Sequence, residues 1–211
     1  ITPPPTDPSY SDITRVATQL YQRSHKKVKG ISVEIYGWLF EQFLANAGES
    51  MANKDDDHSG TPTKVNFTSS GAIKTMTWIQ ELIKSGAFMN FGSGSSASTN
   101  EMAAFLSGKI GMFLQSSADL SQLTAGTKDK LGITYYPHPD GQKSNGVAIG
   151  GASLWISNDK STTVQRGAWE FIKFLMKAEN QAKWQVATGY LALNKDSQNE
   201  PVLKKLYAKT L

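Results

Sequence analysis

The first apolar residues of the chain recur at helical spacing. The spacing i, i+3, i+4, i+7 places four apolar residues on one side of a helix: Ile13, Val16, Ala17 and Leu20. The pair Ser11-Asp12 directly before them is typical of a helix start. Prolines at positions 3, 4, 5 and 8 restrict the preceding backbone and remove hydrogen-bond donors. We therefore expect an extended entry followed by an amphipathic helix.

Six further segments are predicted to form helices. The first is a long apolar helix over 36–48, which Gly48 ends. The second begins at Ser69-Ser70, ends at Gly86 and turns Ala72, Met76, Ile79 and Ile83 inward. Shorter helices are expected after the cap Thr99 and over 118–126. Near the end of the chain, 163–177 turns Val164, Ala168, Phe171, Ile172 and Leu175 inward, and 180–188 follows as a last helix.

Short runs rich in β-branched and aromatic residues predict the strands. These runs cover 31–35, 64–67, 109–115, 131–139 and 147–157, and we expect the third and the last to be buried. Strands and helices mix without a strict βαβ repeat or an internal duplication. The pattern predicts a single α/β domain over residues 1–211, with a mixed sheet flanked by helices.

Composition narrows the class of protein. Hydrophobic residues make up 39% of the 211 positions and charged residues 19%, which supports a packed core. No apolar run approaches the roughly 20 residues that span a bilayer. The net charge of +4 is scattered, without a basic stripe interleaved with aromatic residues, so we do not expect a nucleic-acid partner.

Metal and cofactor chemistry finds no support in the sequence. The chain has no cysteine, which excludes disulfides, thiol nucleophiles and Cys-based metal centres. The acidic segment 53–60 (NKDDDHSG) departs from a calcium loop, because His58 stands at the glycine position and Lys64 at the final glutamate position. We interpret it as a solvated turn, and we expect neither a metal nor a cofactor.

Catalytic signatures are equally absent, and another pattern is more informative. No serine-nucleophile elbow and no phosphate-binding glycine loop occurs. Aromatic residues instead accompany small polar residues at the ends of predicted elements: Trp38, Ser116, Ser117, Gly150, Gly151 with Trp155, and Tyr190. Aromatic faces contact sugar or polyol C–H groups, while hydroxyls and backbone N–H groups supply directional hydrogen bonds. These residues predict a small-molecule binding site.

Ordered motifs along nearly the whole chain resemble those of a known family. Residues 150–155 read GGASLW, Glu179-Asn180-Gln181 begins a helix, and Trp184 precedes Thr188-Gly189-Tyr190-Leu191. Upstream, the helix entry at 4–20, the GW-containing helix at 37–51 and the segment 102–120 follow in the same order. This set resembles the extracellular solute-binding proteins of ABC importers, family 1, and is most similar to the glycerol-3-phosphate-binding and sugar-binding branch.

The resemblance implies a fold and a function. It implies a type II periplasmic-binding-protein-like α/β lobe, of which residues 1–211 would be the second, with the first lobe and the final helices absent. The complete protein would capture a carbohydrate, polyol or glycerol phosphate between two lobes and deliver it to membrane permease subunits. It would be a non-enzymatic monomer, located in the periplasm or outside the cell as a membrane-anchored lipoprotein.

The same resemblance assigns roles to residues. Trp38 would stack on the ligand, Ser116 or Ser117 would offer a hydroxyl, Gly150 and Gly151 would donate backbone N–H groups, and Tyr190 would supply an aromatic contact. The chain departs from the family pattern at Ala192, where proline is usual, and at Gly111, where alanine is common. The arginine that helps to hold phosphate in this branch would lie beyond Leu211.

Two alternatives from other classes remain open. A glycan-active enzyme needs two carboxyl groups about 5–9.5 Å apart, and Glu34 with Glu41 is the nearest candidate pair. A structural surface domain would bind no solute at a defined place. Sugar hydrolysis that depends on either glutamate would identify the first, and the absence of any localised ligand response would identify the second.

Overall fold

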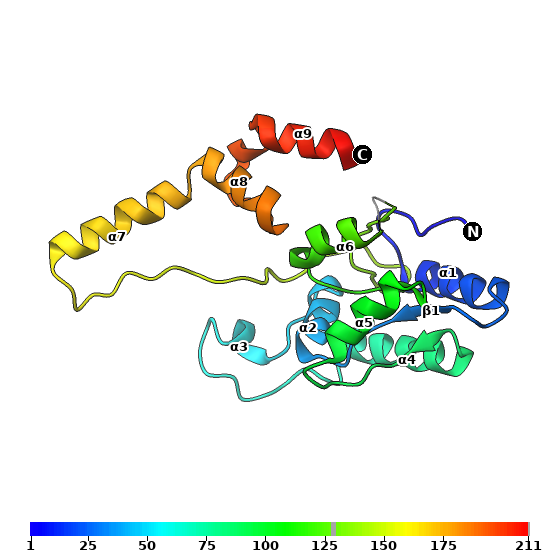
Figure 1. Cartoon of the computed structure of the whole chain (residues 1–211). Coiled ribbons are helices and arrows are strands. Elements are labelled where there is room, and N and C mark those ends of the chain that lie inside the picture. The colour runs from blue at the N-terminus through cyan, green and yellow to red at the C-terminus, as the bar shows by residue number, and fades with distance from the viewer. Residues whose placement is uncertain (128–129, 211) are drawn as a thin grey trace. The chain divides into compact units, whose positions relative to one another are not determined.

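A computed structural model describes residues 1–127 and 130–210, which fall into two compact units (Figure 1). Unit 1 comprises Ile1–Leu114 and Gly132–Ile149, and unit 2 comprises Gln115–Leu131 and Gly150–Leu211. The assignment of the whole chain to one lobe stays a prediction.

The sheet of unit 1 has three parallel strands in the order β2-β1-β3. They are β1 (Lys29–Ser32), β2 (Phe88–Met89) and β3 (Ile110–Phe113), and Ile31 stands opposite Phe88 on one side and Met112 on the other. The α/β class and the strands near 31–35 and 109–115 are confirmed. Within the described residues the sheet is parallel and not mixed.

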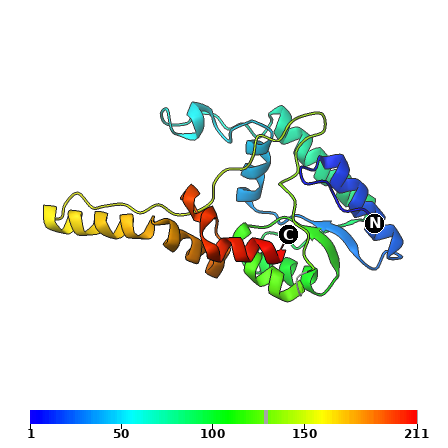
Figure 2. The same ribbon diagram turned by 90° about the horizontal axis from the view of Figure 1, so that it is seen from above.

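Unit 1 contains five helices in its described residues. They are α1 (Tyr10–Arg23), α2 (Gly37–Asn46), α3 (Asn53–Asp56), α4 (Ser70–Ser85) and α5 (Ala97–Leu106). Local signals set their ends: Ser9 caps α1, and Ser69 and left-handed Gly86 bound α4. Figure 2 shows α1 and α4 side by side. The helix expected after Thr99 begins earlier, at Ala97, and the acidic segment with α3 is an exposed turn.

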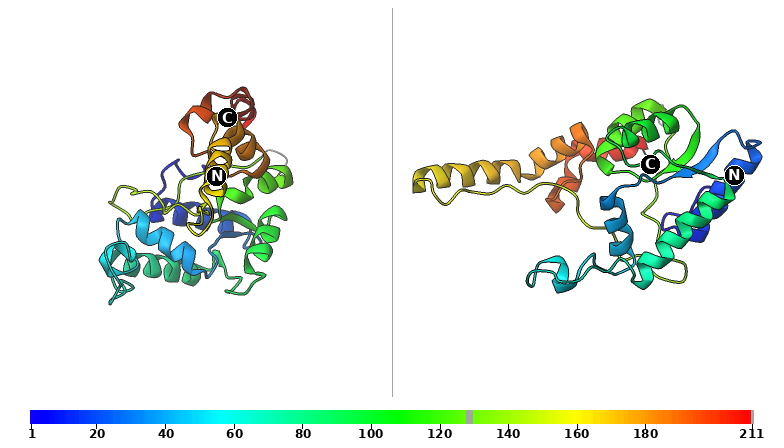
Figure 3. Two further views of the ribbon diagram at one scale, coloured as in Figure 1. Left: turned by 90° about the vertical axis from the view of Figure 1, so that its left-hand side faces the viewer. Right: turned by 90° about the horizontal axis from the view of Figure 1, so that it is seen from below.

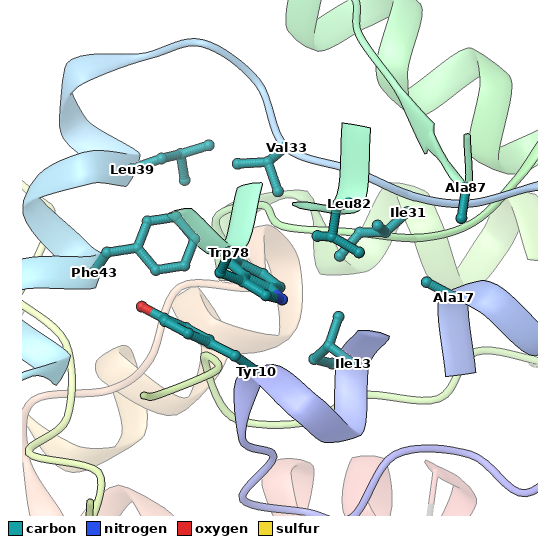
Figure 4. Close-up of a cluster of buried hydrophobic side chains, with 10 residues drawn as sticks. All are labelled: Tyr10, Ile13, Ala17, Ile31, Val33, Leu39, Phe43, Trp78, Leu82 and Ala87. Carbon is teal, nitrogen blue, oxygen red and sulfur yellow. The ribbon is translucent and has the colours of Figure 1, made fainter. Parts of the chain in front are cut away.

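An aromatic cluster forms the centre of unit 1 (Figure 4). Tyr10 of α1 and Trp78 of α4 stack with ring centroids 4.3 Å apart, and Phe43 of α2 meets the edge of Trp78 at 5.8 Å. Both polar ends are satisfied, because Trp78 Nε1 donates to Thr14 Oγ1 at 2.9 Å and the Tyr10 hydroxyl bonds to Thr75. Aromatic contacts of this kind stabilise a core by more than the burial of their apolar area alone.

The face of α4 that packs inward agrees with the expected one at Ala72, which is 0% exposed, and at Ile79, which packs against the core, but not at Met76 and Ile83. Met76 and Ile83 are 53% and 51% exposed, whereas Trp78 and Leu82 are 5% and 0% exposed. Helix α4 carries two apolar stripes, and its spacing alone does not distinguish them. The stripe with Trp78 is buried because Tyr10 and Phe43 cover it.

Two predicted strands of unit 1 are wrong. Segment 64–67 makes only an isolated bridge, between Val65 and Ala52. Segment 131–139 forms no strand, since Pro137 and Pro139 lack the N–H groups that a ladder needs. Its main-chain contacts are few, such as the N–H of His138 donating to the carbonyl of Pro8 at 3.1 Å.

A buried asparagine in the first segment of unit 1 (Ile1–Leu114) holds the second segment (Gly132–Ile149) in place. The side-chain amide of Asn46 donates to the carbonyl oxygens of Tyr136 at 2.8 Å and Pro137 at 3.1 Å. Its oxygen accepts from the Ser144 hydroxyl at 2.6 Å and the Asn145 N–H at 3.1 Å. One side chain with 0% exposure therefore satisfies four polar groups of a segment that has no regular structure of its own.

Unit 2 is helical in the described residues. It contains the short 3-10 helix η1 (Ser117–Asp119), α6 (Leu120–Thr127), α7 (Thr162–Leu175), α8 (Ala178–Thr188), η2 (Lys195–Asn199) and α9 (Pro201–Thr210). The helices expected near 118–126, 163–177 and 180–188 are confirmed. Its core lies between α8 and α9, where Ala182 and Leu203 are fully buried and Gln185 donates to the Tyr207 hydroxyl at 2.9 Å.

The predicted burial of segment 147–157 and of one face of α7 is wrong in this structure. The segment is extended but forms no strand, and Ile149 and Trp155 are 91% and 90% exposed. Helix α7 has no buried residue, and Phe171 is 59% exposed. Figure 3 shows the extended segment without a neighbouring strand. The apolar pattern is correct for burial, but no described residue covers it.

Candidate ligand-binding site

Trp38 lies at the carboxyl end of the parallel sheet of unit 1. Strand β1 ends at Ser32, a short connection follows, and Trp38 is the second residue of α2. Its ring is half-buried against the aromatic cluster and is 6.3 Å from the ring of Tyr36. Ligands of open α/β sheets bind at the carboxyl ends of the strands, so this position suits a ligand contact.

Ser116 and Ser117 begin the first helical turn of unit 2, shortly after β3 in the sequence. The Ser116 hydroxyl accepts a hydrogen bond from the N–H of Ala118 at 3.2 Å and so caps η1. Ser117 is the first residue of η1 and is exposed. Ser116 therefore has a structural role that the sequence did not reveal, while the Ser117 hydroxyl faces solvent.

A close backbone contact brings the Tyr190 turn to the serine pair. Gly189 ends α8 in a left-handed conformation with φ of 84°, and a Cβ at this position would lie 2.9 Å from the carbonyl oxygen of Ser117. Only glycine accepts both this conformation and this approach. Tyr190 follows directly and is 46% exposed. An aromatic ring and a free hydroxyl-bearing turn are thus neighbours within unit 2.

The other predicted contacts are not joined to this pair. Gly150 and Gly151 lie in the exposed extended segment, and nothing is within 4 Å of the position that a Cβ on Gly151 would take. Trp38 belongs to unit 1. The roles of all six residues stay predictions.

Sequence reasoning missed a buried carboxyl group in unit 1. Glu101 of α5 has 0% exposure, and neither of its oxygens accepts a hydrogen bond from a described residue. Burial raises the pKa of Glu101 to about 7, the nearby Ser32 hydroxyl lowers it, and the charge of Glu34 raises it further. A glutamate in a helix of alternating polarity gives no sign of burial in the sequence.

A surface cavity of about 610 Å³ lies between α1 and α4. Arg15, Lys74, Glu81 and Asp140 contribute charges of both signs to its wall, beside the stacked rings of Tyr10 and Trp78. This mixture gives no preference for one class of ligand.

The described part of the chain contains neither a metal-binding cluster nor a membrane-spanning helix. No group of three or more His, Asp or Glu side chains there could hold a metal ion. No described helix has the length and apolarity required to cross a membrane.

Solved structures define the class of fold. MalE, the sugar-binding protein of Xanthomonas citri, superimposes with a TM-score of 0.72 over 98% of this chain and 52% of its own, at 16% identity. UgpB from Mycobacterium tuberculosis, solved in complex with glycerophosphocholine, superimposes with a TM-score of 0.68 over 97% of this chain and 49% of its own, also at 16% identity. The chain therefore has the α/β fold of the type II periplasmic binding proteins.

The family follows from the sequence match. The chain belongs to the bacterial extracellular solute-binding protein family, whose model matches residues 4–210. It is 32% identical over 160 residues to the sn-glycerol-3-phosphate-binding periplasmic protein UgpB of Pectobacterium atrosepticum, and 30% identical over 162 residues to UgpB of Escherichia coli K12. These matches cover 74% and 75% of this chain but 35% and 36% of the relatives. The chain thus spans about a third of the length of these curated relatives.

Proposed function

We propose that the chain is part of the solute-binding component of an ABC importer, which captures a carbohydrate or glycerol-phosphate-type solute and presents it to a membrane permease. The family match over residues 4–210 carries this proposal. Ligand would bridge two lobes and favour the closed form that the permease recognises. The protein would act in the periplasm or on the cell surface, where a lipid anchor would hold it.

The geometry of unit 2 supports a solute contact at Ser117 and Tyr190. The Gly189 turn holds an exposed aromatic ring next to an exposed hydroxyl-bearing turn. A ring can cover the C–H face of a sugar or glycerol while the hydroxyl accepts or donates a hydrogen bond. Trp38 of unit 1 is a separate predicted stacking contact.

The exposed apolar faces of unit 2 support a larger functional protein. Trp169, Phe171 and Phe174 of α7 are between 51% and 59% exposed, and the extended segment before α7 leaves Trp155 uncovered. Phe171 and Phe174 lie three positions apart on one side of α7, and large apolar side chains exposed together in this way are normally covered. We infer that additional polypeptide, of the kind that the longer relatives contain, packs on this face. The dye 8-anilinonaphthalene-1-sulfonate should fluoresce with this chain, and Phe171→Ser with Phe174→Ser should reduce the signal, whereas Ile133→Ser in unit 1 should not.

An enzyme is the weaker candidate. Glu101 has the raised pKa of a general acid, but it is fully buried and cannot reach a substrate in this conformation. The proposed protein is therefore a binding protein without catalysis.

An NMR titration of the ¹⁵N-labelled chain tests the proposal. Glycerol-3-phosphate, glycerophosphocholine and maltose would be added separately, and we expect affinity in the range of about 1 mM, because in the proposed two-lobe mode one lobe supplies only part of the contacts. Shifts should cluster at Ser116, Ser117 and Tyr190. Tyr190→Ala should weaken them, while Tyr135→Ala, which removes a more exposed ring of unit 1 (67% against 46%), should not.

Three outcomes would contradict the proposal. Shifts confined to other regions would place the site elsewhere. The absence of any shift with all three solutes would favour a structural domain. Hydrolysis of maltose that is lost in Glu34→Gln or Glu41→Gln would show an enzyme.

A further inference from the structure

A buried polar contact lies beneath the carboxyl end of β1. Side chains alternate along a strand, so Ile31 enters the aromatic core while Ser32 points to the opposite face. On that face α5 brings Glu101 next to Ser32, and both side chains have 0% exposure. The Ser32 hydroxyl and both Glu101 oxygens make no hydrogen bond of ordinary geometry with a described residue, although Ser32 lies near enough to lower the pKa of Glu101. The pair is therefore close but unsatisfied.

The groups that face Glu101 do not neutralise a negative charge. Glu34 approaches from the connection after β1, and Tyr136 approaches from the second segment of unit 1. Both are acids, and no basic side chain among the described residues forms an ion pair with Glu101. Burial, together with the charge of Glu34, raises the pKa of Glu101 to about 7. Its proton therefore exchanges near neutral pH.

This carboxyl group is directly linked to the connection that carries Trp38. Residues 33–36 join Ser32 to α2, and the N–H of Ile35 is held by the carbonyl of Gly92 at 3.3 Å. Trp38 follows in the first turn of α2 and packs partly on the core. Because Glu34 lies in this connection, repulsion from an ionised Glu101 acts on it.

We propose that Glu101 is a proton-operated switch for the connection between β1 and α2. While the carboxyl group is neutral, Glu101 of α5 stays buried beside Ser32 of β1, and Trp38 keeps the position described here. When the proton is lost, water enters beside Ser32, Glu34 is repelled, and the connection shifts together with Trp38. The effect on solute capture rests on the proposed function, whereas the switch itself does not.

Two NMR signals of the full chain test this switch between pH 5.5 and 8.5. One is the side-chain carboxyl ¹³C signal of Glu101, and the other is the indole N–H signal of Trp38, identified by its loss in Trp38→Phe. Both should titrate with the same midpoint near neutrality. In Glu101→Gln the Trp38 signal should keep its low-pH position throughout, while Glu81→Gln, which changes an exposed glutamate of α4, should behave like the unmodified chain.

Other results would overturn the proposal. A Trp38 signal that stays constant while Glu101 titrates would leave Glu101 with a structural role alone. A Trp38 shift that persists in Glu101→Gln would assign the change to another group. If Glu101→Gln does not fold, Glu34→Gln decides, because it should move both midpoints to lower pH together. Neither signal requires a solute, so failure of the proposed function would not affect this test.

Discussion

Gly30 of β1 is the position where one added methyl group should do the most damage. A Cβ there would lie 2.2 Å from the carbonyl oxygen of Ala17 and 2.3 Å from its Cα. Both atoms belong to the backbone of α1, which packs directly on β1 in the core of unit 1. No side-chain rotation can relieve this contact, so the helix and the strand must separate.

The size of the effect follows from the atoms that must move. Overpacking a core usually costs about 1–3 kcal/mol, and a backbone clash places Gly30→Ala at the upper end, about 3 kcal/mol. This loss corresponds to a fall in melting temperature of about 6–12 °C for a chain of this size. At Gly111 the nearest atom is Leu20 Cδ1 at 2.5 Å, the end of a flexible side chain. Gly111→Ala should therefore cost less than about 1 kcal/mol.

Urea and thermal unfolding followed by far-UV circular dichroism measure these differences. Gly37→Ala is the matched control, because nothing lies within 4 Å of the added Cβ and the residue begins α2. It should leave stability unchanged or raise it by up to about 1 kcal/mol. A cost below about 1 kcal/mol for Gly30→Ala, or an equal cost for Gly111→Ala, would contradict a clash between the backbones of α1 and β1.

Three further substitutions test other parts of the structure. Because the pKa of Glu101 is raised from 4.5 to about 7, the stability that its neutral form provides is complete below pH 4.5 and is lost as the pH rises through about 7. The free energy of unfolding should therefore fall by about 3 kcal/mol between pH 4.5 and 8 in the unmodified chain, and this fall should be absent in Glu101→Gln. The same pH dependence of the unfolding free energy in both chains, measured with urea, would contradict this. Asn46→Ala should cost about 2–3 kcal/mol in the same titrations, because it leaves buried carbonyl groups unpaired, and a loss below about 1 kcal/mol would show that water replaces them. Gly189→Ala should lower thermal stability by about 1–3 kcal/mol through its left-handed backbone and its approach to Ser117, and an unchanged melting curve would disprove that contact.

Much of the local structure could be predicted from short sequence signals. The predicted start of α1 at Ser11-Asp12 lies one residue after the observed start at Tyr10, which Ser9 caps, and Ser69 and Gly86 bound α4 as expected. The order of motifs along the chain indicated the family. These features depend on residues a few positions apart, so they are independent of how the chain folds back on itself. The α/β class follows from the same information.

The failures share a different physical cause. Periodicity marks which residues are apolar, but it does not say which neighbour covers them. Met76 and Ile83 have helical spacing as regular as that of Trp78, yet only Trp78 meets Tyr10 and Phe43. The segment 147–157 has the composition of a buried strand, but a strand forms only beside a partner, and none lies among the described residues.

The candidate site divides in the same way. The sequence by itself determined which residue types could contact a solute, because an aromatic ring, a hydroxyl group and a glycine keep their chemistry in any fold. Only the tertiary structure decided that the Gly189 turn meets Ser117 and that Glu101 is buried beside Ser32. Both contacts join residues distant in the chain, and desolvation, which sets the pKa of Glu101, depends on everything packed around the carboxyl group.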